Sequence, residues 1–448
     1  MHSRPVLIRD PLWDTIRLDP IACRIVDSAV FQRLRYIRQL GLAHLVYPGA
    51  THTRFDHAIG VYHLAQRTVG ALHQRGDLRR VPEAEARLIP LAALLHDIGH
   101  YPFSHALEEL DEGSIPGHHE TLVGHFLADP GVTQALLDVA ADAAPRIEQL
   151  IRGASDCVLQ GLVSGSLDLD KIEYLKRDAR FCGVPYGDVD VDRLLHSLLV
   201  VEDPHKGKLE VGVHEKGMAA LESLLFAKYQ MFRNVYWHHA VRAATVMYKR
   251  IVLDALEQQL IQSDELIGQT DEGLLHLLAA RDHDRSSGRA ADKHDERARI
   301  RANIGALRAR TLPKRAAEVV AADLEAEPAS WIAVDSPVKR AVEEQLTREL
   351  ELPPHSVFLD FPEKSAMFHL HLLVQRRDGE VLRLGPGGQE GLIGLPRIAD
   401  ELYRTARVLR VFTLYQRRRV APAALVRLAQ LSEADVQAEL ERGTPLLR

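Results

Sequence analysis

Apolar residues recur at helical spacing along most of the first 260 residues. From Ile21 to Ile37 the apolar positions lie three or four residues apart, which predicts one continuous helix. The same period recurs over residues 56–74, 83–95, 172–181 and 216–260. The last of these ranges is long enough for two helices. Pro90 should kink or interrupt its helix, because proline has no backbone N–H to donate.

Turn-forming dipeptides and a charged stretch interrupt this helical pattern. Asp10-Pro11 and Asp19-Pro20 flank a short segment with apolar positions, and they predict a hairpin near the N-terminus. Residues 281–301 are rich in Asp, Arg and Ser and include Ser286-Ser287-Gly288. We therefore expect a solvated, mobile loop there.

The pattern changes in the last quarter of the chain. Residues 356–361 and 369–375 alternate between apolar and polar positions, which is typical of strands. Asp378-Gly379 separates the second of these segments from residues 381–384 and predicts a β-hairpin. Residues 395–415 return to helical spacing. This part of the chain is therefore expected to mix helices and strands.

Length and composition fit a folded protein with a large helical core. Of the 448 residues, 46% are hydrophobic and 26% are charged, which argues against a disordered chain. We expect a mainly α fold in three parts: a helical core over residues 1–260, a helical extension with the charged loop over 261–330, and a smaller mixed α+β C-terminal module over 331–448.

Charge, cysteine content and hydropathy exclude several classes of protein. The 56 Lys and Arg against 62 Asp and Glu give a net charge of −6, which argues against a chain that coats nucleic acid, so no nucleic-acid partner is required. Cys23, Cys157 and Cys182 are too few and too scattered for a disulfide framework or a thiolate metal cage. No apolar run is long enough to cross a bilayer, and no signal-type apolar core follows Met1. We expect a cytoplasmic protein with no membrane partner.

The candidate chemistry rests on the 23 histidines, many of which lie between His44 and His125. Histidine transfers protons near neutral pH and binds transition metals. His96-Asp97 follows an apolar run, which places an imidazole and a carboxylate at the end of a buried helix. The two side chains can share one divalent ion or bridge two. Because such dipeptides also occur by chance, His96-Asp97 alone is weak evidence.

Two further motifs flank this dipeptide in a characteristic order. His57 lies at a predicted helix start upstream, and Asp170 opens a predicted helix downstream. The order His, His-Asp, Asp resembles that of the HD-domain metal-dependent phosphohydrolases. The resemblance implies that His57, His96, Asp97 and Asp170 hold a divalent metal; two nitrogen and two oxygen donors suit Mn, Fe, Zn, Ni or Co better than Mg alone. The alternative interpretation is four polar residues that satisfy one another inside a helical core.

Within that superfamily the chain is similar to the deoxynucleoside-triphosphate (dNTP) triphosphohydrolases, the branch of the sterile-alpha-motif HD-domain dNTPase. The resemblance covers about the first 250 residues. It is carried by residues 31–41 (FQRLRYIRQLG), 47–57 (YPGATHTRFDH), 96–105 (HDIGHYPFSH) and 168–174 (DLDKIEY). It implies that a dNTP substrate is cleaved at the α-phosphorus to a deoxynucleoside and inorganic triphosphate.

The leaving 5′-oxygen needs a proton, so a histidine near the metal is expected to donate it. The resemblance makes His105 the first choice. His119 is the second, and Glu120 follows it in a position to orient its ring. His100 lies one turn beyond His96 if the helix continues, where it could bind the α-phosphate or tune the site. The alternative for each of these histidines is an exposed or supporting residue.

The negative charges of a triphosphate require cations nearby. The resemblance assigns Arg54, Lys171 and Lys228 to the phosphates. Lys228 stands where the family has an arginine, which loosens any bidentate geometry.

The sugar is expected to lie along the helix that Asp170 opens. Asp170, Tyr174 and Asp178 fall on one face at i, i+4 and i+8. The resemblance implies that Tyr174 stacks near the sugar and base and that Asp178 accepts from the 3′-hydroxyl. It also assigns to the sugar Gln39, Leu40 and Tyr236. Leu40 against C2′ would reject a ribose hydroxyl. Trp237 replaces the family's Gln, which leaves base preference open; core packing is the alternative for the tyrosines.

The resemblance also implies a nucleotide effector. In the family a guanine nucleotide bridges subunits and activates a tetramer, so we expect a GTP or dNTP effector and a homo-oligomer, either dimer or tetramer. The matching positions are Asp27, Gln32 and Arg35 for the guanine, spread along one predicted helix, and Arg193 and Lys216 for the phosphates. Val6 and His214 replace a Lys and an Arg of the family, which leaves the effector's identity open. The alternative is a set of surface ion pairs.

Two other functions fit the same motifs. Another HD-type nucleotide phosphohydrolase or phosphodiesterase, acting on a nucleoside monophosphate or a cyclic nucleotide, would share the metal ligands and differ in its product. A non-catalytic nucleotide-sensing protein would keep the ligands without turnover. The identity of the product, and the effect of replacing His96 and Asp97, distinguish these alternatives.

Overall fold

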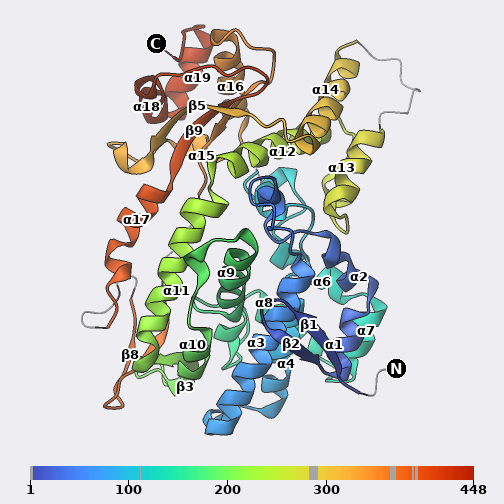
Figure 1. The fold of residues 1–448 in the computed structure, drawn as a ribbon, viewed down its shortest axis with the longest axis vertical. Helices are drawn as coiled ribbons and strands as arrows, with labels where there is room; N and C mark the ends of the chain where they lie inside the picture. The colour runs from blue at the N-terminus through green and yellow to red at the C-terminus, as the bar shows by residue number, and fades with distance from the viewer. Residues whose placement is uncertain are drawn as a thin grey trace.

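The computed structural model describes residues 4–110, 112–281, 291–363, 370–385, 388 and 392–447. Helices predominate in this described part, which confirms the mainly α fold. The molecule is elongated (Figure 1): a helical core lies at one end and a small sheet with its helices at the other. The helices α11 (Met218–Met231) and α12 (His239–Glu257) run between the two ends.

The N-terminal hairpin is confirmed, whereas the helix predicted after it is wrong. β1 (Val6–Asp10) pairs antiparallel with β2 (Asp14–Leu18). The chain over residues 21–37 is not one helix but α1 (Pro20–Val26), α2 (Ala29–Gln32) and a 3₁₀ turn over Arg33–Tyr36. It breaks at Ser28, whose hydroxyl accepts from the backbone N–H of Phe31 and so caps a new helix.

Three helices form the framework of the core, as the periodicity predicts: α3 (Arg54–Arg75), α4 (Glu83–Leu95) and α9 (Leu169–Cys182). α3 packs against both of the others. Pro90 does not interrupt α4; Ile89 and Leu91, on either side of the proline, are buried in the core and favour the helix despite the missing hydrogen bond. Shorter helices complete this end: α5 (Ser104–Leu107), α6 (His119–Leu127), α7 (Pro130–Leu137), α8 (Ala143–Ile151) and α10 (Val191–Ser197).

The two helices predicted over residues 216–260 are α11 and α12, and a π-helical turn over Phe232–Tyr236 joins them. A four-stranded sheet lies beside the core in the order β3 (Leu198–Glu202), β4 (Leu209–His214), β7 (Leu373–Gln375) and β8 (Val381–Arg383). β7 and β8 form the hairpin predicted at Asp378-Gly379, and β7 pairs parallel with β4. The start of the predicted 369–375 strand, His369, lies outside the described residues. The division of the chain at residues 260 and 330 stays a prediction.

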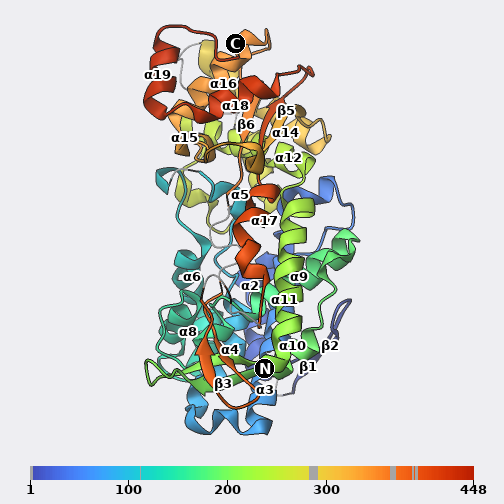
Figure 2. The same cartoon turned by 90° about the vertical axis from the view of Figure 1, so that its left-hand side faces the viewer.

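The C-terminal sheet has three antiparallel strands, β5 (Lys314–Val320), β9 (Val408–Thr413) and β6 (Val357–Asp360), with β9 in the centre. The helix predicted over residues 395–415 is therefore only half right. α17 (Ala399–Ala406) runs beside α11 (Figure 2), and the chain then becomes β9. β9 is the central strand and carries buried apolar residues on both faces of the sheet, so the spacing of its apolar residues resembles that of a helix.

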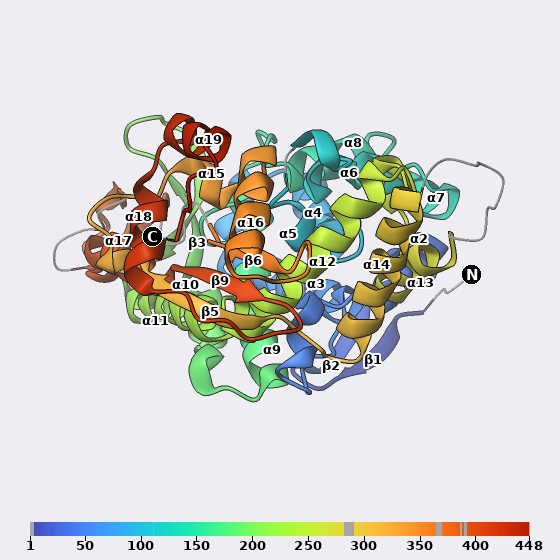
Figure 3. The ribbon, with the colours of Figure 1, turned by 90° about the horizontal axis from the view of Figure 1, so that it is seen from above.

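Four helices lie beside this sheet (Figure 3): α15 (Ser330–Ala333), α16 (Pro337–Glu349), α18 (Pro422–Gln430) and α19 (Glu433–Glu441). α16 packs against β6, and α18 packs against β5. α13 (Asp271–Ala280) and α14 (Ala291–Arg308) pack against each other at the upper right of Figure 1, and α14 also packs against α12. The loop predicted over residues 281–301 is wrong from Ala291 onward, because Ile300, Ile304 and Leu307 bury an apolar face of α14 against α12. Residues 282–290 lie outside the described part.

Within the described residues, no helix combines the length and the apolar character needed to cross a membrane.

Candidate functional site

The four residues proposed as metal ligands are positioned by three helix ends. His57 lies in the first turn of α3, where Thr53 and Asp56 cap each other's backbone N–H groups and fix the start of the helix. His96 follows the last residue of α4. Asp170 lies in the first turn of α9, a helix capped by Asp168. The sequence folds this way locally because each capping side chain stands directly before an amphipathic run.

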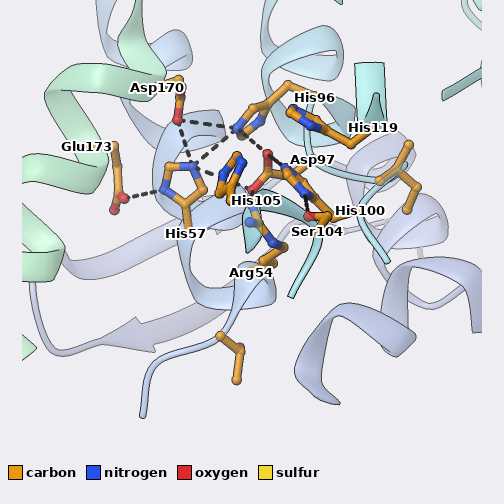
Figure 4. A network of polar contacts seen from close by, with 12 residues as sticks. Arg54, His57, His96, Asp97, His100, Ser104, His105, His119, Asp170 and Glu173 are labelled. Carbon is orange, nitrogen blue, oxygen red and sulfur yellow. Dashed lines mark hydrogen bonds and ion pairs between the residues drawn. The ribbon is translucent and has the colours of Figure 1, made fainter. Parts of the chain in front are cut away.

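The structure brings the four side chains together (Figure 4). The Nε2 atom of His57 lies 2.9 Å from Oδ1 of Asp170 and 3.2 Å from Nε2 of His96. His96 Nε2 lies 3.3 Å from Oδ1 of Asp97 and 3.5 Å from Oδ1 of Asp170. His57 is completely buried. Nitrogen and oxygen atoms that could bind a metal, from three separate parts of the chain, therefore lie close together.

The donor set fits a cation. Two imidazole Nε2 atoms at 3.2 Å cannot both present a lone pair to each other without a proton or a metal ion between them. Burial alone would lower the pKa of His57, but Asp170 and Glu173 outweigh it and raise this pKa to about 10. The surroundings therefore favour positive charge here. His57, His96 and Asp97 lie close enough together to hold a divalent ion, and Asp170 adds a further oxygen.

A second layer of contacts orients His57. The Nδ1 atom of His57 lies 2.7 Å from Oε2 of Glu173, and the indole N–H of Trp13 donates to Oε1 of the same carboxylate at 2.9 Å. Arg177 donates to Glu173 at 2.7 Å and to Asp10 at 3.0 Å. This arrangement places the proton of His57 on Nδ1 and directs Nε2 toward the other ligands.

The sequence interpretation missed these supporting residues. Glu173 lies within residues 168–174, three positions after Asp170, so its place on the same helix was a usable signal. Trp13 lies 160 residues from Glu173, and nothing in the local pattern connects the two. Gly60 was missed for a similar reason: a Cβ there would lie 2.0 Å from Oε1 of Glu173, so only glycine admits this carboxylate.

Replacing Glu173 with glutamine is expected to weaken metal binding by about 10–100-fold, because His57 loses the anionic acceptor that orients it. Titration calorimetry with Mn²⁺ measures the effect. Asp188→Asn serves as the control, since the Asp188 side chain is 95% exposed. An unchanged Mn²⁺ dissociation constant in folded Glu173→Gln protein would contradict the role assigned to Glu173.

Asp97 is held from two further sides. Arg54, which is buried, donates from Nη1 to Oδ2 of Asp97 at 2.7 Å. His100 Nε2 lies 3.0 Å from Oδ1 of Asp97, and its Nδ1 lies 2.5 Å from the hydroxyl of Ser104. The prediction that α4 continues to His100 is wrong, since the helix ends at Leu95. His100 reaches the site through a turn instead, and burial holds its pKa well below the usual range.

The two candidate proton donors share one carboxylate that the sequence interpretation did not single out. Glu108 Oε1 lies 2.7 Å from Nδ1 of His119, and its Oε2 lies 3.1 Å from Nδ1 of His105. The partner expected for His119, Glu120, is exposed instead. The rings of His100 and His119 stack with centroids 3.7 Å apart. A chain of side chains thus connects Asp97, through His100, to the pair held by Glu108.

A glycine allows this stacking. A Cβ on Gly99 would lie 2.1 Å from the backbone carbonyl oxygen of His119. The turn after His96-Asp97 therefore needs glycine so that the start of α6 can approach the site.

Of the residues assigned to the sugar, Tyr236 and Tyr174 lie near Asp178. Its Oδ2 accepts from the hydroxyl of Tyr236 at 2.6 Å, and its Oδ1 lies 2.8 Å from Nε2 of His52, a residue that the sequence interpretation missed. Tyr174 lies one turn earlier on α9, and burial followed by nearby carboxylates raises its pKa. Leu40 is half-buried against the same core.

The other side chains that the resemblance assigns to the substrate are buried or already hydrogen-bonded within the protein. Lys171 donates to the backbone carbonyl of Gly165 at 2.9 Å and pairs with Asp168, so its ammonium is already engaged. Lys228 on α11 is 7% exposed. The side-chain Oε1 of Gln39 is buried without a protein hydrogen-bond partner, and Trp237, where the family has Gln, is buried.

The five positions assigned to an effector form two groups. Gln32 donates to the carbonyl of Val26 at 2.7 Å, and Arg35 donates to Oε1 of Gln32 at 2.8 Å. Asp27 caps α1, so the three guanine positions do not share one helix as predicted. Arg193 donates to the backbone carbonyl of Lys216 at 3.2 Å. α10, which carries Arg193, lies on the opposite side of α9 from α1 and α2 (Figure 1).

Comparison with known proteins agrees with this geometry. Residues 54–135 match the HD domain, and residues 189–390 match the HD associated region. An uncharacterized protein of Methanocaldococcus jannaschii is 36% identical over 273 residues, which cover 61% of this chain and 54% of that protein. The human deoxynucleoside triphosphate triphosphohydrolase SAMHD1 is 28% identical over 263 residues, which cover 52% of this chain and 42% of that protein.

A solved structure extends the similarity to most of the chain. A phosphohydrolase from Bacteroides thetaiotaomicron has the same fold, with a TM-score of 0.69 at 21% identity over 92% of this chain and 100% of that one. By sequence, this chain spans about half the length of the curated relatives it matches.

Proposed function

This chain belongs to the HD-domain family, and on that premise we propose that it is a metal-dependent phosphohydrolase that converts dNTPs into deoxynucleosides and inorganic triphosphate. The observation that carries the proposal is the convergence of His57, His96, Asp97 and Asp170 beside the histidine pair held by Glu108. A metal site and a proton donor are the two parts that this hydrolysis requires.

His57, His96, Asp97 and Asp170 would hold the divalent ion. When bound, such an ion lowers the pKa of water and polarises a phosphoryl oxygen. Water attacks the α-phosphorus and releases one proton to solvent as its oxygen bonds to phosphorus, and the bond from that phosphorus to the 5′-oxygen of the sugar breaks. Arg54 is fixed against Asp97, where its positive charge can neutralise charge that develops on the phosphate.

The leaving 5′-oxygen receives its proton from His105, which is the better placed of the two histidines because its side chain is 60% exposed and open to a substrate. Glu108 orients that ring through Nδ1 and so directs Nε2 outward. His119, on the other oxygen of Glu108, is largely buried and supports the carboxylate.

Deoxyribose selectivity is proposed to come from the residues that are assigned to the sugar. Asp178 and Tyr236 form a hydrogen-bonded pair that can meet the 3′-hydroxyl. Leu40 presents an apolar surface on which a 2′-hydroxyl would lose its hydrogen bonds to water without replacement. The corresponding expectation is that NTPs are hydrolysed about 10²-fold or more slowly than dNTPs.

The test is a product-identified assay of purified protein with each dNTP and each NTP, in Mg²⁺ and in Mn²⁺, with and without GTP or dGTP. Inorganic triphosphate and a deoxynucleoside are the expected products. Release of orthophosphate or a monophosphate instead would indicate a different HD-type phosphohydrolase, and no turnover under any condition would favour a nucleotide-sensing protein. Equal rates on dNTPs and NTPs would contradict the role of Leu40.

The arms of this assay that contain GTP or dGTP also test the proposed effector. Activation together with a change to a dimer or tetramer, measured by light scattering, is the result that the assignment of Asp27, Gln32, Arg35, Arg193 and Lys216 leads us to expect.

A further inference from the structure

Three consecutive residues after α5 face three different parts of the molecule. Glu108 holds His105 and His119, as described above. Glu109 points the other way and accepts from both terminal nitrogens of Arg242, at 2.7 and 2.8 Å, and from Lys249 at 2.9 Å. Leu110 forms an isolated parallel β-bridge with Asp335, which lies between α15 and α16. The position of Glu108 therefore depends on what holds its neighbour.

Arg242 connects Glu109 to the C-terminal sheet. Its guanidinium is 5% exposed and uses a second edge to bind Asp360, the last residue of β6, with Nε at 3.0 Å and Nη2 at 2.6 Å. Burial alone would raise the pKa of Glu109, but Arg242 and Lys249 outweigh it and lower this pKa to about 2. Glu109 is thus ionised, and one arginine joins two carboxylates in fixed bidentate geometry.

Lys249 makes a parallel connection two turns further along α12. It is 3% exposed and pairs with both Glu109 and Asp335, the latter at 2.6 Å. Lys339 on α16 also pairs with Asp335, at 2.9 Å, and Arg410 pairs with Asp360 at 3.5 Å. Four cations thus face three carboxylates in a buried network, which is sensitive to the loss of any member. Figure 3 shows α12 passing beside β6 and α16, where this network lies.

We propose that Arg242 is a positioning residue for proton donation: through Glu109, it lets the C-terminal sheet set where Glu108 holds His105 and His119. Because the contacts run from Asp360 through Arg242 to Glu109, the C-terminal module influences the proton-donor side of the site and leaves the four metal ligands unaffected. The kinetic consequence rests on the proposed function; the structural coupling does not.

The experiment uses Glu109→Gln and Asp360→Asn in the full chain. Each substitution keeps the size of the side chain and removes one of the two anions that hold Arg242. Both are expected to lower kcat by about 10–100-fold, because a displaced proton donor acts less effectively. KM and the Mn²⁺ dissociation constant should not change. The double variant should lose no more than the stronger single variant, because both act on one connection.

Glu343→Gln is the matched control. Glu343 is also buried where α12 meets the C-terminal module. It pairs with Arg250 of α12 and accepts from the backbone N–H of Leu359, but it makes no hydrogen bond or ion pair with residues 108–110. Its replacement should lower the melting temperature without changing kcat. If Glu343→Gln loses as much kcat as Glu109→Gln, or if Glu109→Gln keeps full kcat, the inference is wrong.

A second measurement does not depend on turnover. Backbone amides of Glu108 and Leu110 donate to the carbonyls of Ser104 and Leu107 at 2.7 and 2.9 Å. Hydrogen–deuterium exchange over residues 104–110 should become faster in Glu109→Gln and in Asp360→Asn, and not in Glu343→Gln. Wild-type protein that releases no product from any nucleotide would overturn the proposed function alone. Unchanged exchange in both test variants would overturn the coupling alone.

Discussion

Asp97→Ala is expected to abolish both metal binding and hydrolysis, with turnover falling by at least about 10³-fold. Asp97 is 5% exposed and meets His96, Arg54 and His100 at 3.3, 2.7 and 3.0 Å. Its removal therefore takes away one proposed metal ligand and also leaves a buried arginine without its carboxylate. Metal content by mass spectrometry and triphosphate release from a dNTP measure the two effects.

Folding has to be checked in this variant, because an unpaired buried Arg54 costs stability. Asp97→Asn keeps the shape of the side chain and should retain the native circular dichroism spectrum while it still fails to bind Mn²⁺ tightly. Asp138→Asn, on an exposed side chain that pairs with Arg24, is the control for loss of one surface carboxylate. Full turnover in metal-free Asp97→Asn protein would show that the four side chains are not a catalytic metal site.

The positions of the four proposed metal ligands could be predicted from the sequence because each follows a local helix signal. Thr53 caps α3 just before His57, Asp168 caps α9 just before Asp170, and an apolar run leads to His96. Short-range rules therefore place each ligand at a helix end. These rules do not predict that the helix ends lie close together. The resemblance to the family implied that they do, and the structure places the side chains 2.9–3.5 Å apart.

The supporting residues could not be predicted in the same way. Trp13 and Glu173 meet across 160 residues, and Arg242 and Glu109 across 133. Contacts of this kind depend on how helices pack, which a single sequence does not encode in any local period. Adjacency in the sequence makes Glu120 the predicted partner of His119, whereas the observed partner, Glu108, reaches the ring from the end of α5, 11 residues earlier.

The errors in secondary structure have related causes. Residues 21–37 have the spacing of one helix, but the side chain of Ser28 caps a new helix and breaks the run. Residues 291–301 look solvated by composition, yet Ile300 and the apolar positions beyond it pack against α12. Residues 408–413 form a central strand. Its apolar residues lie on both faces, so their spacing along the sequence resembles that of a helix. Tertiary packing overrode local preference in each case.

Glu108→Gln is expected to lower kcat by about 10²–10⁴-fold while Mn²⁺ binding stays unchanged. Hydrogen bonds from His105 and His119 hold the pKa of Glu108 well below its usual range despite burial, so the group is a carboxylate at every working pH. Glutamine keeps a hydrogen-bond acceptor for one ring but loses the negative charge. The variant thereby tests the charge of the group that orients His105, separately from the metal site.

The pH dependence of kcat should also shift in the Glu108→Gln variant, in a direction set by the lost charge. An adjacent anion favours the protonated imidazole, so loss of the Glu108 charge lowers the pKa of the donor histidine. Activity that needs the protonated donor is full below that pKa and falls as the pH rises through it. In Glu108→Gln the decrease in kcat with rising pH should therefore occur at lower pH than in the wild type. In His105→Asn this decrease should be absent. If the decrease occurs at the same pH in Glu108→Gln as in the wild type, the proton comes from a group that Glu108 does not contact.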